Sequence, residues 1–494
     1  MLARMAADLP LPVHLPAVID GLATNPALPG PMIRRLFAWR PGRGEVAGRP
    51  DLTEELIAEI IATDDHWLLH SLALNKHLPD GFRIRLAAHP DEAVRSALVV
   101  RAESAPREML ERLVDDPVPR VRACLAEDDD TPPDLRARLA ADPDPAIRAT
   151  LAKHWTQAPE EVRRTLLTDP EPQVRAAACA TYFARLPHPV PPSDLLPALL
   201  ADPVTRAGAV VHAVLDEEAF RRLAEDPDSE VRAEVARHPD LPPPVRDVLA
   251  VDPALAVRVK VFARADTPEP LRARIHAAVH ELSPTWKDPE PEADEEALDL
   301  WYENMFATTA LRILRLEWVA ADPLPHIDSP YVSFRVSAAL GKELPADAVA
   351  RLLDDEEEMV RLTMAANAPH LVDPRTAESI ERRYRRRDKF TFWWDTKEVL
   401  AFAPETLHRF ATDPEPRLRS FAPRDPQLPA ELAEQLAADP EERVRHAVAG
   451  HRRLPLPALL RLLADPSDRV ARAAAASPHL PVESMERLLD LVGL

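Results

Sequence analysis

The sequence predicts an all-α solenoid, a superhelix of short paired helices that repeats about every 26 residues. Three observations predict it. An Asp-Pro pair or its equivalent recurs along most of the 494 residues, an apolar residue follows nearly every such anchor by four positions, and 55 prolines accompany only 10 glycines. Proline starts helices and interrupts strands, and a repeat period of about 20 to 50 residues marks stacked repeats. Such a chain grows by adding repeats and needs no single large core.

The repeating unit is clearest in residues 141–154, ADPDPAIRATLAKH. Asp142 is expected to cap a helix, because its carboxylate can accept hydrogen bonds from the first turn, and Pro143 is expected at the first helical position. Ile147 is expected to point inward. His154, eleven residues after Pro143, is expected to end the helix, since the chain has too few glycines for the usual glycine cap.

The same unit recurs at regular steps. Most steps between successive anchor residues are 26 or 27, but the step from Pro170 to Pro203 is 33, and the apolar position is lost at Pro203. That interval contains an insertion, TYFARLPHPVPP, which is expected to bend the stack or project a loop. The anchors are Pro90, Pro117, Pro143, Pro170, Pro203, Pro227, Pro253, Pro330, Glu356, Pro414, Pro440 and Pro466.

Two stretches carry the complete pattern DPxxxVRxxVAxHPxLPxxxLxxLAxDP almost unchanged, Asp226–Pro253 and Asp439–Pro466. This pattern resembles the leucine-rich repeat variant family and, more loosely, HEAT-type repeats. The resemblance covers residues 82–282 and 328–494, and it implies paired short helices, the second of each pair 3₁₀ in character, and no catalytic residues. The family's prototype has a cysteine-ligated iron–sulfur module. With two isolated cysteines in this chain, that function is not carried over.

Departures from the repeat predict the domain organisation. Residues 1–80 fit the repeat poorly and are expected to cap the first repeat, which would otherwise expose an apolar face. The segment after the first array is acidic and proline-rich, and a long apolar helix over 297–320 is expected to follow it. The predicted regions are the cap (1–80), a first array (81–282), the linker and long helix (283–327), and a second array (328–494) with an interruption at 375–411.

Charge and composition narrow the function. With 61 basic and 82 acidic residues the net charge is −21, which as a whole disfavours nucleic acid and anionic membranes as partners. Cys124 and Cys179 lie in alanine-rich helices and are expected to be buried apolar residues. No signal region or apolar run of about 20 residues is present, so a cytoplasmic location is expected. The preference for arginine over lysine is typical of a GC-rich genome, and we expect a bacterial source.

An arginine usually follows the repeated apolar residue, so the repeats would stack these side chains into a ladder. Such a ladder could track a phosphate backbone. Alternatively, each arginine pairs with an aspartate or a carbonyl of a neighbouring repeat, which the acidic composition favours; pairs of this kind hold register more than they add stability. The ladder arginines are Arg95, Arg122, Arg148, Arg175, Arg232, Arg258, Arg335, Arg361, Arg419 and Arg445.

The interruption contains a second candidate site, in which basic residues precede aromatic ones. Arginines next to aromatic rings could hold phosphates while the rings stack on bases, or could bind an acidic protein partner. The third interpretation is a solvated basic helix whose trailing aromatic residues fill the core. The candidate residues are Arg382, Arg383, Arg385, Arg386, Arg387, Trp393 and Trp394.

Motifs for catalysis and metal binding are missing from the sequence. It has no Gly-rich phosphate loop, no GxSxG, no HExxH and no CxxC, and so no cofactor is expected. The best prediction is a non-enzymatic scaffold that binds a protein or peptide along an extended surface. Nucleic-acid binding through residues 382–394 is the alternative. A HEAT-like DNA glycosylase, with a tryptophan and an aspartate in a basic concave face, is a remote third possibility suggested by Trp393, Trp394 and Asp395.

Overall fold

The computed structural model describes residues 11–42, 44–100, 105–180, 190–281, 295–384 and 400–494. These residues form helices joined by short connections, and none of them lies in a β-strand. The prediction of an all-α solenoid is therefore confirmed. Within the same ranges, no helix combines the length and the apolar character that crossing a membrane requires.

Two compact units make up the chain, and each is described by itself. Unit 1 combines residues from both ends of the chain, Met1–Leu139 and Phe402–Leu494, and unit 2 is the central segment Ala140–Ala401. These boundaries differ from those expected at residues 80, 282 and 327. They differ because a contact between the first and last helices of the chain, described below, has no local signature in the sequence.

Unit 1 is a stack of helix pairs. Its N-terminal part contains α2 (Leu15–Ala23), α3 (Gly30–Arg35), η1 (Leu36–Ala38), η2 (Glu45–Gly48), α4 (Glu54–Ala62), α5 (His66–Ala73), α6 (Asp80–Leu86), α7 (Glu92–Ala97), α8 (Arg107–Leu113), α9 (Pro119–Glu127) and α10 (Pro133–Arg138). Its C-terminal part contains α28 (Pro404–Phe410), α29 (Pro416–Arg419), η7 (Ala422–Arg424), α30 (Ala430–Ala437), α31 (Glu442–Val448), α32 (Leu456–Leu462), α33 (Asp468–Ala475) and α34 (Val482–Leu491).

Unit 2 is a second stack of the same kind. Its first part contains α11 (Pro145–His154), α12 (Glu160–Leu167), α13 (Pro172–Ala178), α14 (Leu196–Ala201), α15 (Arg206–Val210), α16 (Glu217–Ala224), α17 (Ser229–Arg237), α18 (Pro243–Leu249), α19 (Leu255–Ala263) and α20 (Glu269–Glu281). Its second part contains α21 (Glu295–Ile313), α22 (Glu317–Ala321), η5 (Leu324–His326), α23 (Val332–Ala338), α24 (Ala346–Leu353), α25 (Glu358–Asn367), η6 (Pro369–Leu371) and α26 (Pro374–Arg383).

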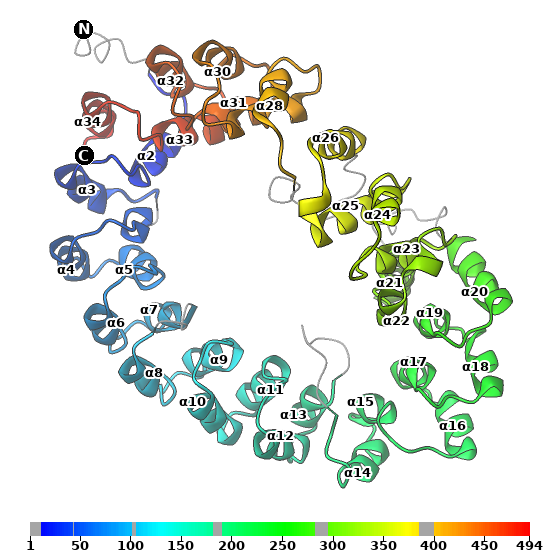
Figure 1. Ribbon diagram of the computed structural model, residues 1–494. Coiled ribbons are helices and arrows are strands. Elements are labelled where there is room, and N and C mark those ends of the chain that lie inside the picture. The colour runs from blue at the N-terminus through cyan, green and yellow to red at the C-terminus, as the bar shows by residue number, and fades with distance from the viewer. Residues whose placement is uncertain (1–10, 43, 101–104, 181–189, 282–294, 385–399) are drawn as a thin grey trace. The chain divides into compact units, whose positions relative to one another are not determined.

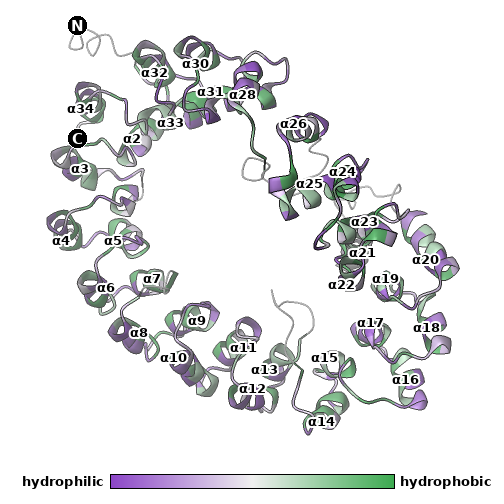
Figure 2. Cartoon of the chain, in the orientation of Figure 1, coloured by the Kyte–Doolittle hydropathy of each residue, from purple (hydrophilic) through white to green (hydrophobic). Residues whose placement is uncertain are grey.

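Within each unit the first helices of successive repeats form one row and the second helices form another. In unit 2, α11, α13, α15, α17 and α19 follow one another in the first row, and α12, α14, α16, α18 and α20 form the second (Figure 1). Figure 2 shows that the helices carry both hydrophilic and hydrophobic stretches. Helices this short are unstable alone, so their stability comes from packing against neighbouring helices.

The repeated apolar position fills the core between the two rows. Val94, Val121, Ile147 and Val174 are all no more than 2% exposed. These four residues stand at the same place in consecutive repeats, four positions after the anchor. The core of each unit is therefore a line of equivalent side chains rather than one central cluster, as expected for a solenoid.

The arginine that follows this apolar residue links neighbouring repeats. Arg148 donates from Nε to Asp169 Oδ2 at 2.7 Å and from Nη2 to Asp169 Oδ1 at 2.9 Å, and from Nη1 to the Asp142 carbonyl at 2.8 Å. The guanidinium thus binds an aspartate of the next repeat and a carbonyl of its own. Equivalent arginine–aspartate ion pairs are Arg95–Asp116, Arg175–Asp202, Arg206–Asp226, Arg232–Asp252, Arg335–Asp355, Arg419–Asp439 and Arg445–Asp465.

The first helix of the repeat in residues 141–154 begins later than the sequence suggested. α11 starts at Pro145, and its N-cap residue is Asp144, whose side chain accepts from the Ala146 N–H at 2.9 Å. Asp142 instead accepts from the N–H of Asp144 at 2.9 Å. The prediction that Asp142 caps the helix and Pro143 starts it is wrong. The physical reason is that a residue before proline disfavours the helical conformation, which leaves Asp144 extended.

The long helix expected over residues 297–320 is also corrected. α21 ends at Ile313 and α22 begins at Glu317. Between them the buried Leu316 donates its N–H to the Ser337 hydroxyl at 2.8 Å instead of to a carbonyl within a continuing helix. α21 packs against both α19 and α23, so it takes the place of a first helix in the stack.

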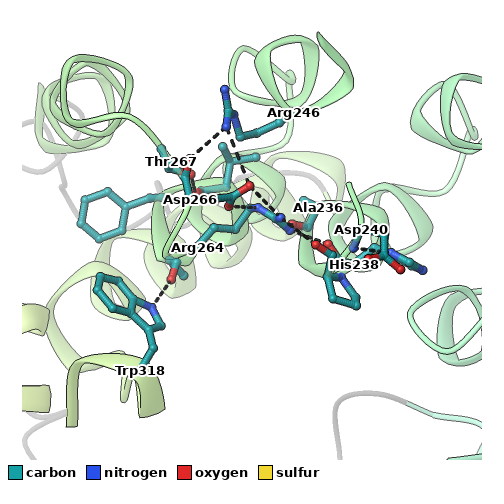
Figure 3. A network of polar contacts seen from close by, with 12 residues as sticks. Ala236, His238, Asp240, Arg246, Arg264, Asp266, Thr267 and Trp318 are labelled. Carbon is teal, nitrogen blue, oxygen red and sulfur yellow. Dashed lines mark hydrogen bonds and ion pairs between the residues drawn. The ribbon is translucent and has the colours of Figure 1, made fainter. Parts of the chain in front are cut away.

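Polar side chains at the opposite end of the first helices make a second link between repeats. In Figure 3, Arg264 donates to the carbonyl oxygens of Ala236 at 3.0 Å and His238 at 2.6 Å, both in the preceding repeat. His238 in turn donates from Nε2 to the Ala213 carbonyl at 2.9 Å. These residues stand eleven positions after their anchors, as His154 does. The sequence suggested that helices end at this position where it holds His154, His238, Asn367 or His451. α11 does end at His154 and α25 at Asn367, whereas α31 ends at Val448, three residues before His451.

The N-terminal helix pair also belongs to the stack. In unit 1, α2 packs against α33 and α3 against α34, so the first repeat of the chain lies beside the last one (Figure 1). The first repeat therefore has a neighbour on this side, where the sequence suggested a cap over an open end.

Replacing Arg148 by alanine tests the first link. We expect Arg148→Ala to lower the free energy of unfolding by about 2 kcal/mol, because it leaves the carboxylate of Asp169, 5% exposed, without its charged donor. Denaturant titration followed by circular dichroism measures the change. Arg138→Ala is the matched control, since Arg138 pairs with Asp115 on the surface, with both side chains largely exposed. Equal losses for both variants would contradict a structural role for the ladder.

Candidate functional site

A cavity of about 170 Å³ lies in unit 2 at the irregular repeat between Pro170 and Pro203. It is bounded by the C-terminal ends of first-row helices and by α12, so it opens where successive repeats would otherwise stack closely. Its walls combine apolar and charged side chains. The lining residues are Ala152, Trp155, Arg163, Leu166, Leu167, Ala178, Cys179, Ala180, Pro191, Gly208, Val211, His212, Glu234 and Arg237.

The cavity exists because the repeat changes its geometry here. α13 ends at Ala178, and α15 approaches the end of α13 so closely that a Cβ built on Gly208 would lie 1.6 Å from the Cys179 carbonyl oxygen. Only glycine permits this approach. Cys179 donates its thiol to the Thr205 carbonyl at 3.3 Å, which fixes the two segments together.

The ladder nevertheless continues through the irregular repeat. Arg206, three residues after Pro203 rather than five, pairs with Asp226 at 2.8 Å. Thr205, 1% exposed, donates its hydroxyl to the Leu199 carbonyl at 2.7 Å and occupies the interior near the position where other repeats have an apolar residue. The missing large apolar residue four positions after Pro203 therefore marks a local shift of the repeat pattern by two residues. The link between repeats is kept.

A buried carboxylate lies at one wall of the cavity. Glu234 is 3% exposed and accepts from Arg237 Nη1 at 2.7 Å. Burial raises the pKa of Glu234, while the nearby cations Arg237 and Lys260 oppose the rise. Lys260 stands at the equivalent position of the next repeat, and burial lowers its pKa. Glu234 thus pairs with the half-exposed Arg237 at the cavity wall.

The two titratable side chains Cys179 and His212 both line the cavity in their neutral forms. Burial raises the pKa of the Cys179 thiol to about 12, so this thiol stays protonated at neutral pH. A protonated thiol is a poor nucleophile and a poor metal ligand. Burial and the charge of Arg237 lower the pKa of His212, which favours its neutral form.

The size of the cavity limits its occupant. Sites for drug-sized molecules and cofactors usually measure about 300–1,000 Å³. A cavity of 170 Å³ is smaller than these and matches a single side chain. Leu166 and Leu167 give it an apolar wall, and Arg163, which donates from Nη1 to the Val190 carbonyl at 3.3 Å, adds a second guanidinium to that of Arg237.

The sequence-predicted basic cluster is only partly described. Arg382 donates from Nε to Glu378 at 2.9 Å, and Arg383 donates from Nη1 to Asp354 at 2.6 Å. The guanidinium groups of both arginines are thus engaged with carboxylates of unit 2. The other candidates in this cluster lie outside the described residues: Arg385, Arg386, Arg387, Trp393 and Trp394.

The ladder residues do not gather at the cavity. Arg148, Arg175, Arg232 and Arg445 pair with aspartates of the following repeats. Arg122 and Arg258 donate to the carbonyls of aspartates in their own repeats, and Asp142 supplies the carbonyl for Arg148. None of these seven residues lines the cavity.

Metal ligation finds no support in the described ranges, where no group of three or more His, Cys, Asp or Glu residues is placed to hold an ion. His66 and His70, spaced four apart on α5, stack with ring centroids 6.2 Å apart. His66 Nδ1 lies 2.5 Å from Asp91 Oδ2, and its ring meets Trp67 edge-on.

Sequence reasoning missed the residues that give the cavity its character. Gly208, His212, Glu234 and Arg237 had no motif around them: they lie on first helices or, for His212, in the turn just after one. The usable signal was the 33-residue step, followed by a glycine in a chain with only 10 of them. That combination marks the place where two helices approach too closely for a side chain.

Comparisons with known proteins add little. No family model matches the chain, and no curated protein matches it significantly. A crystal structure of an engineered protein aligns over 92% of this chain and 98% of its own length, at 14% identity and a TM-score of 0.12. A similarity at this level carries no argument about fold or function.

Alkylation tests the environment of the cavity thiol. We expect Cys179 to resist iodoacetamide in the folded protein at pH 8, because a buried thiol with a pKa of about 12 supplies almost no thiolate. Peptide mass spectrometry after timed labelling measures the modified fraction, and labelling in denaturant provides the control. Modification of Cys179 at the same rate in both conditions would contradict its placement.

Proposed function

We propose that the protein is a non-enzymatic helical-repeat scaffold that binds a protein or peptide partner. The observation that carries the proposal is the 170 Å³ cavity at the irregular repeat, which offers space for one side chain of a partner. Regular solenoids use extended surfaces for binding, and a departure from the repeat is where such a surface gains specificity.

The chemistry of the cavity indicates what the partner presents. The apolar wall formed by Leu166 and Leu167 suits an aliphatic or aromatic side chain. Arg163 suits a carboxylate next to that side chain, because guanidinium groups bind carboxylates with paired hydrogen bonds, whereas Arg237 is already paired with Glu234. We therefore infer a peptide segment in which an apolar residue lies next to an acidic residue.

Nucleic acid is the weaker candidate. A phosphate-binding stripe needs guanidinium groups that are free to bind phosphates, and eight ladder arginines are paired with aspartates. Arg382 and Arg383 are also engaged with carboxylates. The net charge of −21 adds repulsion.

A scaffold role also agrees with the resemblance to the leucine-rich repeat variant family, which implies no catalytic residues. The protonated thiol of Cys179 and the paired carboxylate of Glu234 support binding over catalysis at the cavity. The glycosylase alternative depends on Trp393 and Trp394, which lie outside the described residues, and it gains no support here.

A cavity-filling variant tests the proposal. Peptides are selected from a random library on the immobilised wild-type protein, and their affinities are measured by fluorescence anisotropy. We expect Ala180→Trp to weaken the selected peptides at least about tenfold, because the indole occupies the space of one partner side chain. Ala123→Trp is the matched control: Ala123 is partly buried, as Ala180 is, but lies on α9 outside the cavity, and this variant should leave affinity unchanged.

Two results would contradict the proposal. Equal affinity of the peptides for wild type and the folded Ala180→Trp variant would remove the cavity as the binding site. Enrichment of no peptide, together with nucleic-acid binding whose affinity falls steeply with salt, would favour the alternative function.

A further inference from the structure

One interface of unit 1 joins residues that are more than 400 positions apart. Asn25, fully buried at the end of α2, donates from Nδ2 to the carbonyls of Ala475 at 2.8 Å and Ser477 at 2.7 Å. Inside the same unit, Asn75 donates from Nδ2 to the carbonyls of Ala47 at 3.0 Å and Arg49 at 2.8 Å. In both cases the two acceptors are two residues apart, at the end of the neighbouring first-row element. The interface thus repeats the normal link between adjacent repeats.

We call this interface the seam. It is the contact of α2, α3 and η2, with their flanking residues, against α33, α34 and their flanking residues. Other polar contacts also cross it. Arg472 on α33 pairs with Glu45 on η2 at 2.7 Å. Arg35 on α3 pairs with Asp490 on α34 at 2.5 Å and also donates to the Leu494 carbonyl. His14 adds a bond from Nε2 to the Pro466 carbonyl at 2.8 Å.

The two helices at the centre of the seam approach very closely. A Cβ built on Gly21 of α2 would lie 2.1 Å from the Arg472 carbonyl oxygen, so only glycine fits. The packed side chains are fully buried: Val18, Ile19 and Leu22 on α2 have 0% exposure, and so do Ala471, Ala474 and Ala475 on α33. Opening the seam would therefore expose two different apolar faces, which solenoid ends must cover to stay soluble.

The seam differs from other repeat junctions in its connectivity. Successive repeats elsewhere follow one another along the chain, whereas the two sides of the seam are distant in the sequence and are held together by non-covalent contacts alone. The C-terminal face is complementary to the N-terminal face of this chain, and an identical N-terminal face on a second molecule has the same shape and charges. Nothing in these contacts distinguishes the N-terminal face of the same molecule from that of a second molecule.

We propose that the seam is an exchangeable interface whose partner is a second copy of this chain. In the exchanged form α2 and α3 of each copy pack on α33 and α34 of the other. The two faces are different, and reciprocal exchange forms two identical seams, which closes a two-fold dimer and leaves no face open for a fibre. This inference does not depend on the proposed peptide-binding function.

Charge reversal at the seam tests the proposal through two double variants. The first, Arg472→Glu with Arg35→Glu, places like charges opposite Glu45 and Asp490 within its own seam. The second, Glu45→Arg with Asp490→Arg, places like charges opposite Arg472 and Arg35. Each variant therefore repels itself at both positions, whether the seam closes within one molecule or between two identical molecules.

A mixed dimer of the two variants restores opposite charges at both seams. In one seam the native Glu45 faces the native Arg472, and the glutamate introduced at position 35 faces the arginine introduced at position 490. In the other seam the native Arg35 faces the native Asp490, and the arginine introduced at position 45 faces the glutamate introduced at position 472. The variants are checked for folding by circular dichroism, mixed in equal amounts, warmed to just below the unfolding transition and cooled. Native mass spectrometry then separates the mixed dimer from either homodimer by mass. We expect the mixed dimer to exceed each homodimer by at least about tenfold, since several weak charge pairs act together.

A matched control uses a pair outside the seam. Arg461 and Glu434 form an exposed ion pair at 3.1 Å between neighbouring repeats. Arg461→Glu and Glu434→Arg leave the native seam intact, so their mixture should form mixed dimer only in the proportion given by random pairing. Three results would overturn the proposal: only monomers in the seam mixture, mixed dimer in the seam mixture at no more than the random proportion, or the same preference for the mixed dimer in the control as in the seam mixture.

Discussion

The ion pair between an arginine of one repeat and an aspartate of the next is the interaction on which the stack depends. Arg232 and Asp252 illustrate it: two nitrogens of the guanidinium meet both carboxylate oxygens at 2.8 and 3.0 Å, and a third nitrogen binds the Asp226 carbonyl at 2.8 Å. Asp252 also accepts from the N–H of Ala254 and so shapes the turn into the next helix. One pair therefore sets the spacing between repeats and the start of a helix, which explains why Asp, Pro and Arg recur together.

The same ion pair also helps to tell the residues that build the stack from those that are available to bind a partner. Where the pair follows its usual spacing, the arginine and the aspartate bind each other, and few charged groups of the repeat remain for a ligand. At the 33-residue step the link moves to Arg206, α13 ends early, and the stack leaves a cavity beside Gly208 and Glu234. Binding specificity is thus expected where the repeat is irregular, while the regular repeats hold that place in position.

The sequence predicted the fold because periodicity is a local property: the anchors and Val94 or Ile147 can be read within one repeat. The sequence-based prediction placed the N-cap of α11 at the wrong residue. Asp142 and Asp144 can both accept hydrogen bonds from backbone N–H groups, and only the path of the backbone in the folded protein assigns their roles. The sequence-based prediction could not find the contact of Asn25 with Ser477, because complementary faces far apart in the chain leave no pattern along it. Of the candidate site, the insertion was visible in the repeat spacing, but the residues lining the cavity were not.

A double-mutant cycle on Arg232 and Asp252 tests the central claim most directly. The single variants Arg232→Ala and Asp252→Ala and the double variant are unfolded by denaturant, and the coupling free energy is taken from the four stabilities. Because both side chains are largely buried and meet with two hydrogen bonds, we predict a coupling of about 1 to 3 kcal/mol. A coupling near zero, with each single variant as stable as wild type, would contradict the claim that these pairs hold neighbouring repeats together.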